Sequence, residues 1–388
     1  MVPGACEGAG EEDGRCRFRG RVALEREERV DRVTRIFASR WGILLAGAVI
    51  GGIAALLQWW GNPPNMGVCV ACMERDIVGA LGFHRAEPVQ YLRPEIMGLV
   101  LGAFAGALFF REFRGRGGSA PAVRFVLGFF AMTGALVFLG CPWRMLLRIA
   151  GGDWNGLVGL CGIIAGIGVG TLFLRGGYTL GRSQKGPATS GLLWPVLATA
   201  LLALLLVGPQ LATGVPFASK QGPGSMHAPV WASLAGAALV GFLAQRSRFC
   251  TVGGIRDFLL IRDSHLLSGA AALVVAALAA NLILGQFSPG FRGQPIAHSA
   301  HLWNFLGMAL SGLAFVLAGG CPGRQLILAG EGDQDAGIFA LGMLSGAAFA
   351  HNFGVASSPA GPGPWGPAAV LTGLAACFGI GFFMRRKA

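Results

Sequence analysis

Charged side chains are scarce in this 388-residue sequence. Asp, Glu, Lys and Arg make up 13% of the chain, whereas the residues AVILMFWYC make up 53% and the mean hydropathy is +0.59. A soluble domain carries about a quarter of its residues as charged side chains. Here 17 of the 50 charged residues lie within residues 1–40, which leaves the remainder poorer still. The composition excludes a soluble globular protein, a coiled coil and a disordered chain, and it predicts an all-α polytopic membrane protein.

Several chemical signatures are also missing. The chain has no P-loop, no GxSxG, no HExxH and no basic–aromatic pattern typical of nucleic-acid binding. The net charge of +12 therefore indicates the loop bias that orients membrane helices, with no nucleic acid as a partner. The nine cysteines do not form a disulfide framework, because most lie at the edges of apolar runs. No cofactor is expected.

Glycine, in contrast, is abundant, with 64 residues, and small residues let membrane helices approach closely. Apolar runs near the spanning length of about 20 residues predict ten transmembrane helices. They lie near residues 42–60, 94–111, 123–140, 155–174, 191–211, 230–245, 267–286, 302–319, 336–352 and 367–384. Four segments between them are too short to cross, and each begins at or just after a cysteine: 69–82, 142–150, 250–262 and 322–330.

The arginines predict the orientation of these spans. Loops 111–118 and 175–185 and the C-terminal tail are rich in Arg and Lys, whereas the outer loops 212–229, 287–301 and 353–366 hold only Lys220 and Arg292 between them. Arg and Lys favour the cytoplasmic side, so both termini are expected in the cytoplasm of a multi-pass protein of the inner (plasma) membrane. Residues 1–40 have mixed charge and no apolar signal region, and they predict a solvated cytoplasmic extension.

The chain contains an internal repeat. CVACMERD from Cys69 and CTVGGIRD from Cys250 share the pattern C-x5-R-D at an offset of 181, and GCPWR and GCPGR share GCPxR at an offset of 180. The repeat divides the membrane region into residues 41–212 and 213–388. Since five spans separate equivalent positions, the second copy would enter the membrane upside down. Transporters with such inverted repeats form their sites near the midplane from broken helices.

The repeat singles out four cysteines as candidate substrate-path residues: Cys69, Cys141, Cys250 and Cys321. Cys141 and Cys321 each precede a proline, and proline is favoured at the first position of a helix. A helix N-terminus attracts anions and activates thiols, and Arg144 and Arg324 add a cation one turn further on. An arginine at membrane depth costs about 2.5–3.5 kcal/mol on insertion scales, which favours a function for it.

Other residues are assigned supporting roles. Arg75-Asp76 and Arg256-Asp257 are expected to form ion pairs that hold broken helices in place, and Asp153 and Asp333 are expected to cap or pair. Isolated cysteines such as Cys161 and Cys377 are interpreted as packing residues.

A metal site is the weaker interpretation of these cysteines. Cys69-x2-Cys72 has ligand spacing, but Gly253 stands at the equivalent of Cys72, and the topology puts the four repeated cysteines on opposite faces.

These motifs resemble those of the YeeE/YedE family of sulfur-compound transporters. The stretches GVCVACMERDIVGALG, VQYLRPEIMGLVLGAF and QRSRFCTVGGIRDFLL and the two GCPxR motifs carry the resemblance, which covers about residues 42–384 and is strongest to the selenium-transporter branch. It implies an hourglass shape, with short helices from both faces meeting at a constriction. It also implies that Cys69, Cys141, Cys250 and Cys321 relay thiosulfate, with Cys72 an additional thiol. A cytosolic TusA/SirA-like sulfur carrier is the implied partner, besides the lipid bilayer.

A second hypothesis comes from another functional class. C-V-A-C-M-E-R followed by an apolar helix also resembles the quinone-linked disulfide oxidoreductase DsbB, which uses an outward CxxC. That enzyme needs a second outer cysteine pair, is far shorter and has no inverted second half. Transport is therefore favoured over an enzymatic role. The sequence leaves open whether the anion contains sulfur or selenium and whether its transport is passive or ion-coupled.

Overall fold

The computed structural model describes residues 36–37, 39–208 and 214–385. Most of the expected extension 1–40, with Cys6 and Cys16, lies outside them. The described chain is almost entirely helical, and its one small sheet pairs β1 (Arg116–Gly117) with β2 (Gln184–Lys185) in antiparallel fashion. The helices are α2 Arg40–Trp59, α3 Val70–Ala80, η1 Glu87–Val89, α4 Pro94–Phe109, α5 Pro121–Phe138, α6 Pro142–Ala150, α7 Asn155–Arg175, α8 Ala188–Gly191, α9 Leu193–Val207, η3 Pro223–Ser225, α10 Val230–Ser247, α11 Thr251–Ile261, α12 His265–Ile283, α13 His301–Ala318, α14 Pro322–Gly330, α15 Gln334–Asn352 and α16 Gly366–Phe383.

Each of the ten expected spans contains one long helix. Within the described residues, seven candidate spans are long and apolar enough to cross a membrane, and they contain α2, α4, α5, α7, α12, α13 and α16. The helices in the other three expected spans do not meet these limits of length and apolar composition, for different reasons. Helix α9 has 15 residues, whereas α10 and α15 reach 18 and 19 but carry polar residues such as Arg246 and Asp335.

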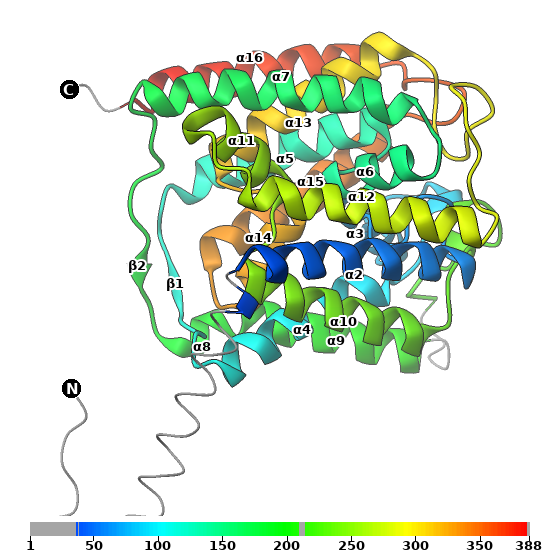
Figure 1. Ribbon diagram of the computed structural model, residues 1–388, viewed down its shortest axis with the longest axis horizontal. Helices are drawn as coiled ribbons and strands as arrows, with labels where there is room; N and C mark the ends of the chain where they lie inside the picture. Colours follow the sequence, from blue (N-terminus) through cyan, green and yellow to red (C-terminus); the bar gives the residue numbers. More distant parts are fainter. Residues whose placement is uncertain (1–35, 38, 209–213, 386–388) are drawn as a thin grey trace, which may run out of the picture.

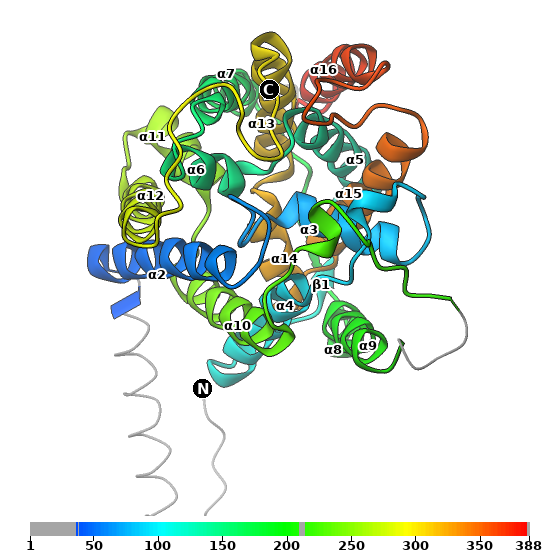
Figure 2. The same ribbon diagram turned by 90° about the vertical axis from the view of Figure 1, so that its right-hand side faces the viewer.

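The four short segments form helices α3, α6, α11 and α14, of 11, 9, 11 and 9 residues. At 1.5 Å per residue they extend about 14–17 Å, half the thickness of a bilayer core of about 30 Å. Figure 1 shows the long helices running roughly side by side, and Figure 2 views them along their length. In that view α3, α6 and α14 lie inside the surrounding long helices.

Glycine brings the long helices into backbone contact. A Cβ atom on Gly102 of α4 would lie 2.0 Å from the carbonyl oxygen of Ala238 in α10, and one on Gly166 of α7 would lie 2.0 Å from that of Ala309 in α13. No larger residue fits at such a crossing, which explains much of the glycine excess.

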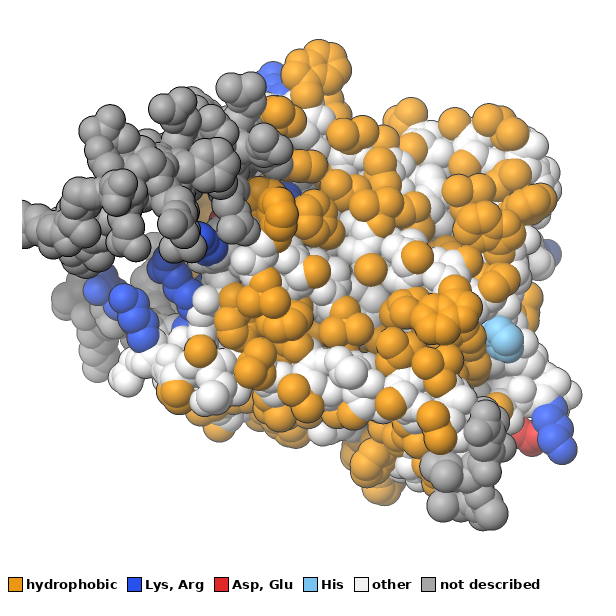
Figure 3. Space-filling view, turned by 90° about the horizontal axis from the view of Figure 1, so that it is seen from below, with side chains coloured by type: hydrophobic (Ala, Val, Ile, Leu, Met, Phe, Trp, Pro, Cys, Tyr) orange, Lys and Arg blue, Asp and Glu red, His pale blue; other side chains and the backbone are white. Residues whose placement is uncertain are grey.

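The flanks of the bundle are apolar. Figure 3 shows hydrophobic side chains along the visible flank, with most of the Lys and Arg side chains gathered at one end. Large exposed apolar side chains on the long helices include Trp41, Leu193, Val275, Ile283 and Phe383. A soluble monomer does not expose so many large apolar residues, whereas a lipid-facing surface does. The protein is an all-α polytopic membrane protein.

Candidate functional site

A cysteine stands at the N-cap of each short helix. Cys69 caps α3 and its Sγ accepts a hydrogen bond from the backbone N–H of Cys72 at 3.4 Å. Cys250 caps α11 in the same way, since its Sγ accepts from the N–H of Gly253 at 3.2 Å. Cys141 and Cys321 cap α6 and α14, each with a proline at the first helical position. All four short helices therefore begin with a thiol beside backbone N–H groups of the first turn.

Three cysteines form a first cluster. The thiols of Cys69, Cys72 and Cys141 interact with one another, and the Cys141 sulfur lies near the backbone of Arg144. The guanidinium of Arg144 reaches the Sγ of Cys72 at 3.5 Å and also bonds the carbonyl oxygens of Leu139 and Ile296. Arginine thus adds a fixed positive charge to this cluster.

Two cysteines form a second cluster. The Sγ atoms of Cys250 and Cys321 lie 3.7 Å apart, and the backbone N–H of Cys321 donates to the Cys250 sulfur at 3.5 Å. The arginine that follows, Arg324, acts electrostatically on both thiols and also pairs with Glu331 at 3.3 Å. The carboxylate of Glu331 therefore offsets part of the positive charge beside the second cluster.

Trp143 lies where the two clusters approach each other. Its ring packs against Phe249 with the centroids 5.8 Å apart, and a Cβ on Gly323 would lie 2.6 Å from the indole. Phe249 precedes Cys250 and Gly323 follows Cys321 by two residues. The Trp143 side chain therefore lies between the two clusters and contacts the residues next to Cys250 and Cys321.

All five clustered cysteines are buried. Cys69, Cys72 and Cys321 have no exposed surface, and Cys141 and Cys250 are 1% and 5% exposed. All are free thiols, as are Cys161, which is exposed on α7, and Cys377, which is buried in α16. In the described part of the chain, no group of three or more His, Cys, Asp or Glu residues is arranged to hold a metal ion.

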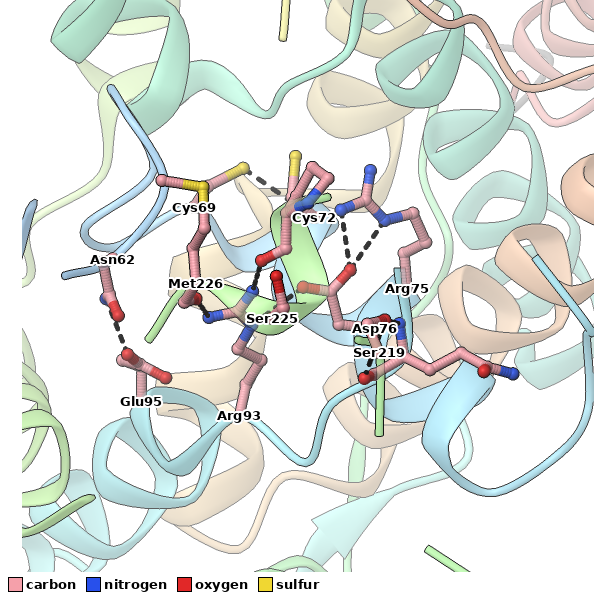
Figure 4. Close-up of polar contacts among 12 residues, drawn as sticks. Asn62, Cys69, Cys72, Arg75, Asp76, Arg93, Glu95, Ser219, Ser225 and Met226 are labelled. Carbon is pink, nitrogen blue, oxygen red and sulfur yellow. Dashed lines mark hydrogen bonds and ion pairs between the residues drawn. The ribbon is translucent and has the colours of Figure 1, made fainter. Parts of the chain in front are cut away.

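The expected ion pair Arg75–Asp76 belongs to a buried network. Asp76 pairs with Arg75 at 2.6 Å and with Arg93 at 2.8 Å. Arg93 also donates to the carbonyl oxygens of Met226 and Pro223, at 2.9 and 2.6 Å. Figure 4 shows this network beside Cys69 and Cys72. It fixes α3 to the start of α4 and to the loop before α10.

A second buried network lies beside it. The carboxylate of Glu95 accepts hydrogen bonds from Asn62 at 2.7 Å and from Ser233 at 2.8 Å. Asn62 in turn accepts from the N–H of Ala228 at 2.8 Å. Figure 4 shows Asn62 turned toward Glu95. These bonds hold the loop before α10 against α2 and α4.

The remaining acidic residues of the motifs are paired or cap helices. Asp153 pairs with Arg148 at 2.5 Å and accepts the backbone N–H of Asn155, whereas Asp333 pairs with Arg116 at 2.7 Å and caps α15. Arg256–Asp257, at 2.8 Å, is a partly exposed neighbour pair on α11. Asp153 and Asp333 thus make the expected pairing and capping contacts, whereas the Arg256–Asp257 pair forms within α11 and connects it to no other helix in the contacts described.

At the end of the molecule near β1, Glu331 joins three arginines: Arg116, Arg248 and Arg324, at 3.5, 3.1 and 3.3 Å. Arg248 also pairs with Glu112 at 3.0 Å. Burial raises the pKa of Glu112, but the contacts from Arg246 and Arg248 outweigh it and leave that pKa below its usual value. The network ties α4, α10 and α14 together at this end.

Sequence reasoning missed three of these residues: Arg93, Glu331 and Trp143. Arg93 and Glu331 carried a usable signal, because each is a charged residue next to an apolar run. Trp143 carried none, since it occupies the variable position of GCPxR and its importance depends on tertiary contacts.

Two comparisons bear on the family. A family model described as sulphur transport matches residues 246–384, which contain α11, α14 and the second cysteine cluster. A 107-residue stretch is 30% identical to the thiosulfate transporter TsuA of Escherichia coli strain K12. That alignment covers 28% of this chain and 30% of the relative's length. Residues 246–384 are thus similar to the sulphur-transport family, and the chain spans about a third of the length of the relative that it matches.

Proposed function

We propose that this protein imports a small sulfur-containing anion, with thiosulfate as the first candidate, across the inner membrane. The path would be lined by Cys69, Cys141, Cys250 and Cys321. The observation that carries the proposal is the pair of buried cysteine clusters at the N-termini of four short helices, within a bundle that has an apolar flank. Helix N-termini favour anions, and thiols can contact a sulfur atom without strong binding.

An inverted repeat with both termini cytoplasmic would supply the alternating arrangement that transport needs. Its support is the reciprocal pairing of the long helices: α2 packs on α12 and α4 on α10, and likewise α5 packs on α15 and α7 on α13. Each pair joins a helix of residues 41–212 to one of residues 213–388. Two similar halves related by a twofold axis produce such reciprocal contacts.

Selenium oxyanions such as selenite are a proposed second substrate class, because they match thiosulfate in charge and in their oxygen atoms. A cytosolic TusA/SirA-like sulfur carrier is the proposed recipient on the cytoplasmic side. Its support is the family resemblance alone. No enzymatic step is needed for the proposed transport.

The alternative, a DsbB-like oxidoreductase, finds less support. Disulfide exchange requires access of a partner thiol to the reactive pair. Cys69 and Cys72 are fully buried, and among the described residues Cys141 is the one further cysteine beside them, whereas that mechanism needs a second pair.

Uptake of isotope-labelled thiosulfate and selenite by cells that make this protein tests the proposal. We expect thiosulfate uptake well above that of cells with the empty vector. The matched control is Cys141→Ser at equal membrane abundance, for which we expect background uptake. Uptake of neither anion above background would contradict the proposal.

A further inference from the structure

Trp143 separates the two cysteine clusters and is itself 1% exposed. It follows Cys141 by two residues on α6, and its ring contacts Phe249 and the position of Gly323 in the second cluster. Trp143 thus belongs to the helix that Cys141 caps and contacts the neighbours of Cys250 and Cys321. An anion that moves directly from one cluster to the other would pass close to the indole.

The repeat is asymmetric at this position. GCPWR has tryptophan at 143, whereas GCPGR has glycine at the equivalent position 323. A Cβ on Gly323 would collide with the Trp143 ring at 2.6 Å, so the space where the two helix tips meet holds one large side chain. The indole of Trp143 thus fills the space between the tips of α6 and α14, one helix from each half.

Three buried hydrogen-bond donors near the cysteines have no partner among the described residues. They are Nε1 of Trp143, Nε of Arg144 and Oγ1 of Thr251. Each residue is at most 1% exposed, and each follows a cluster cysteine by one to three positions. Buried donors are nearly always paired in proteins, so three unpaired ones beside the path indicate a ligand that supplies acceptors.

The order of these donors follows the path. Arg144 contacts the first cluster through Cys72, Trp143 lies between the clusters, and Thr251 adjoins Cys250 in the second. An indole N–H and a guanidinium only donate, a hydroxyl can donate, and sulfur is a weak acceptor. Oxygen atoms of an oxyanion fit this set, whereas an anion without oxygen does not.

We propose that Trp143, Arg144 and Thr251 select an oxygen-bearing anion, such as thiosulfate, sulfite or selenite, over oxygen-free hydrosulfide. This inference rests on the proposed function and narrows its substrate class. Sulfur or selenium at the centre makes no difference to these donors, because they contact oxygen.

Isothermal titration of the purified full-length protein in detergent tests the proposal. The probes are thiosulfate, sulfite and hydrosulfide. The variants are Thr251→Val, which keeps the shape and removes the donor, and Trp143→Phe, which keeps an aromatic ring but is smaller and lacks the donor. We expect each variant to raise the Kd for thiosulfate about tenfold or more, since hydrogen bonds to charged groups are the strong ones. Thr251→Ser keeps the hydroxyl and should keep the wild-type Kd.

Matched controls are Trp365→Phe and Thr171→Val. Trp365 is exposed at the start of α16, and the Thr171 hydroxyl already donates to the carbonyl oxygen of Gly168. Both should leave the Kd unchanged. If Trp143→Phe does not fold, the thiosulfate Kd of Thr251→Val compared with that of Thr251→Ser still tests whether the hydroxyl binds the anion.

Two results would overturn the selection of oxyanions: an equal thiosulfate Kd for wild type, Trp143→Phe and Thr251→Val, or hydrosulfide binding as tight as that of sulfite. Failure of the proposed function looks different. If the variants weaken thiosulfate binding as expected but cells take up no thiosulfate, the binding site stands. In that case the protein is not an importer of thiosulfate.

Discussion

At the scale of single residues, position separates the cysteines of this chain into two kinds. The repeated ones cap short helices, where their sulfur atoms meet backbone N–H groups and one another. Cys161 and Cys377 lie inside the long helices α7 and α16, more than one turn after the first helical residue. Cysteine therefore serves as a small apolar packing residue inside the long helices and as a candidate substrate contact at the start of the short ones.

The first prediction concerns this division. We expect Cys141→Ser and Cys321→Ser each to abolish thiosulfate uptake, because serine binds water and oxygen more strongly and does not replace the soft sulfur contact. Cys161→Ser and Cys377→Ser should keep nearly wild-type uptake. The measurement is initial uptake rate at equal membrane abundance. Equal losses from all four variants would mean that the repeat marks packing alone.

The second prediction concerns Cys72. In the second half its place is taken by Gly253, whose N–H bonds Cys250 as the N–H of Cys72 bonds Cys69. The contact that both halves share is therefore made by the backbone N–H, and the Cys72 thiol is an addition in the first half. We expect Cys72→Ser to keep most of the uptake and Cys69→Ser to lose most of it. Equal losses, together with quinone-dependent dithiol oxidation in membranes, would favour the oxidoreductase instead.

How far single residues could be predicted depended on repetition. Cys69, Cys141, Cys250 and Cys321 and the arginines and aspartates beside them stood out because they occur twice. The roles of Arg93 and Trp143 are set by partners far away in the chain, at Pro223 and Phe249. No spacing rule could reveal these partners, although Arg93 itself is visible in the sequence as a charged residue next to an apolar run.

At the scale of elements, glycine contacts repeat with the sequence. A Cβ on Gly162 would lie 2.2 Å from the carbonyl oxygen of Phe305, and one on Gly342 would lie 2.1 Å from that of Phe125. Both members of the second contact differ from those of the first by 180 positions. The α7–α13 and α15–α5 crossings are thus two copies of one contact, built by equivalent residues.

The third prediction tests such a crossing. Gly166→Val should destabilise the fold by about 1–3 kcal/mol or more, because its side chain collides with the backbone of α13. Gly168→Val is the matched control, since a Cβ there meets nothing within 4 Å. Both changes have the same helix propensity effect, so their difference isolates packing. The readout is thermal unfolding in detergent, and equal midpoints for both variants would contradict the argument.

Elements were the most predictable level of this structure. Each of the ten apolar runs contains a long helix, and each short segment became a short helix within two residues of the expected bounds. Helices α9, α10 and α15 are not recognised as membrane spans by length and hydropathy alone. Glycine contacts and buried pairs let helices tolerate polar residues that face protein rather than lipid.

At the scale of the whole molecule, the bundle has two different ends. One end carries β1, β2 and the Glu331 network, and the other carries the loop that Arg93 holds. Helix α4 connects them, because Arg93 precedes its first residue and β1 follows its last. Its 16 residues span about 24 Å.

The last prediction tests which way these ends face. Lys185 lies in β2 at the first end, and Lys220 lies in the loop that bonds Gln90 and Arg93 at the second. Both side chains are exposed. The arginine-rich loops predict that the first end faces the cytoplasm. In a background without Cys6, Cys16 and the exposed Cys161, we expect Lys220→Cys to react with a membrane-impermeant maleimide added to intact cells. Lys185→Cys should react only after the membrane is opened. Labelling of both positions from the same side would contradict the odd number of crossings between them, and with it the upside-down second half.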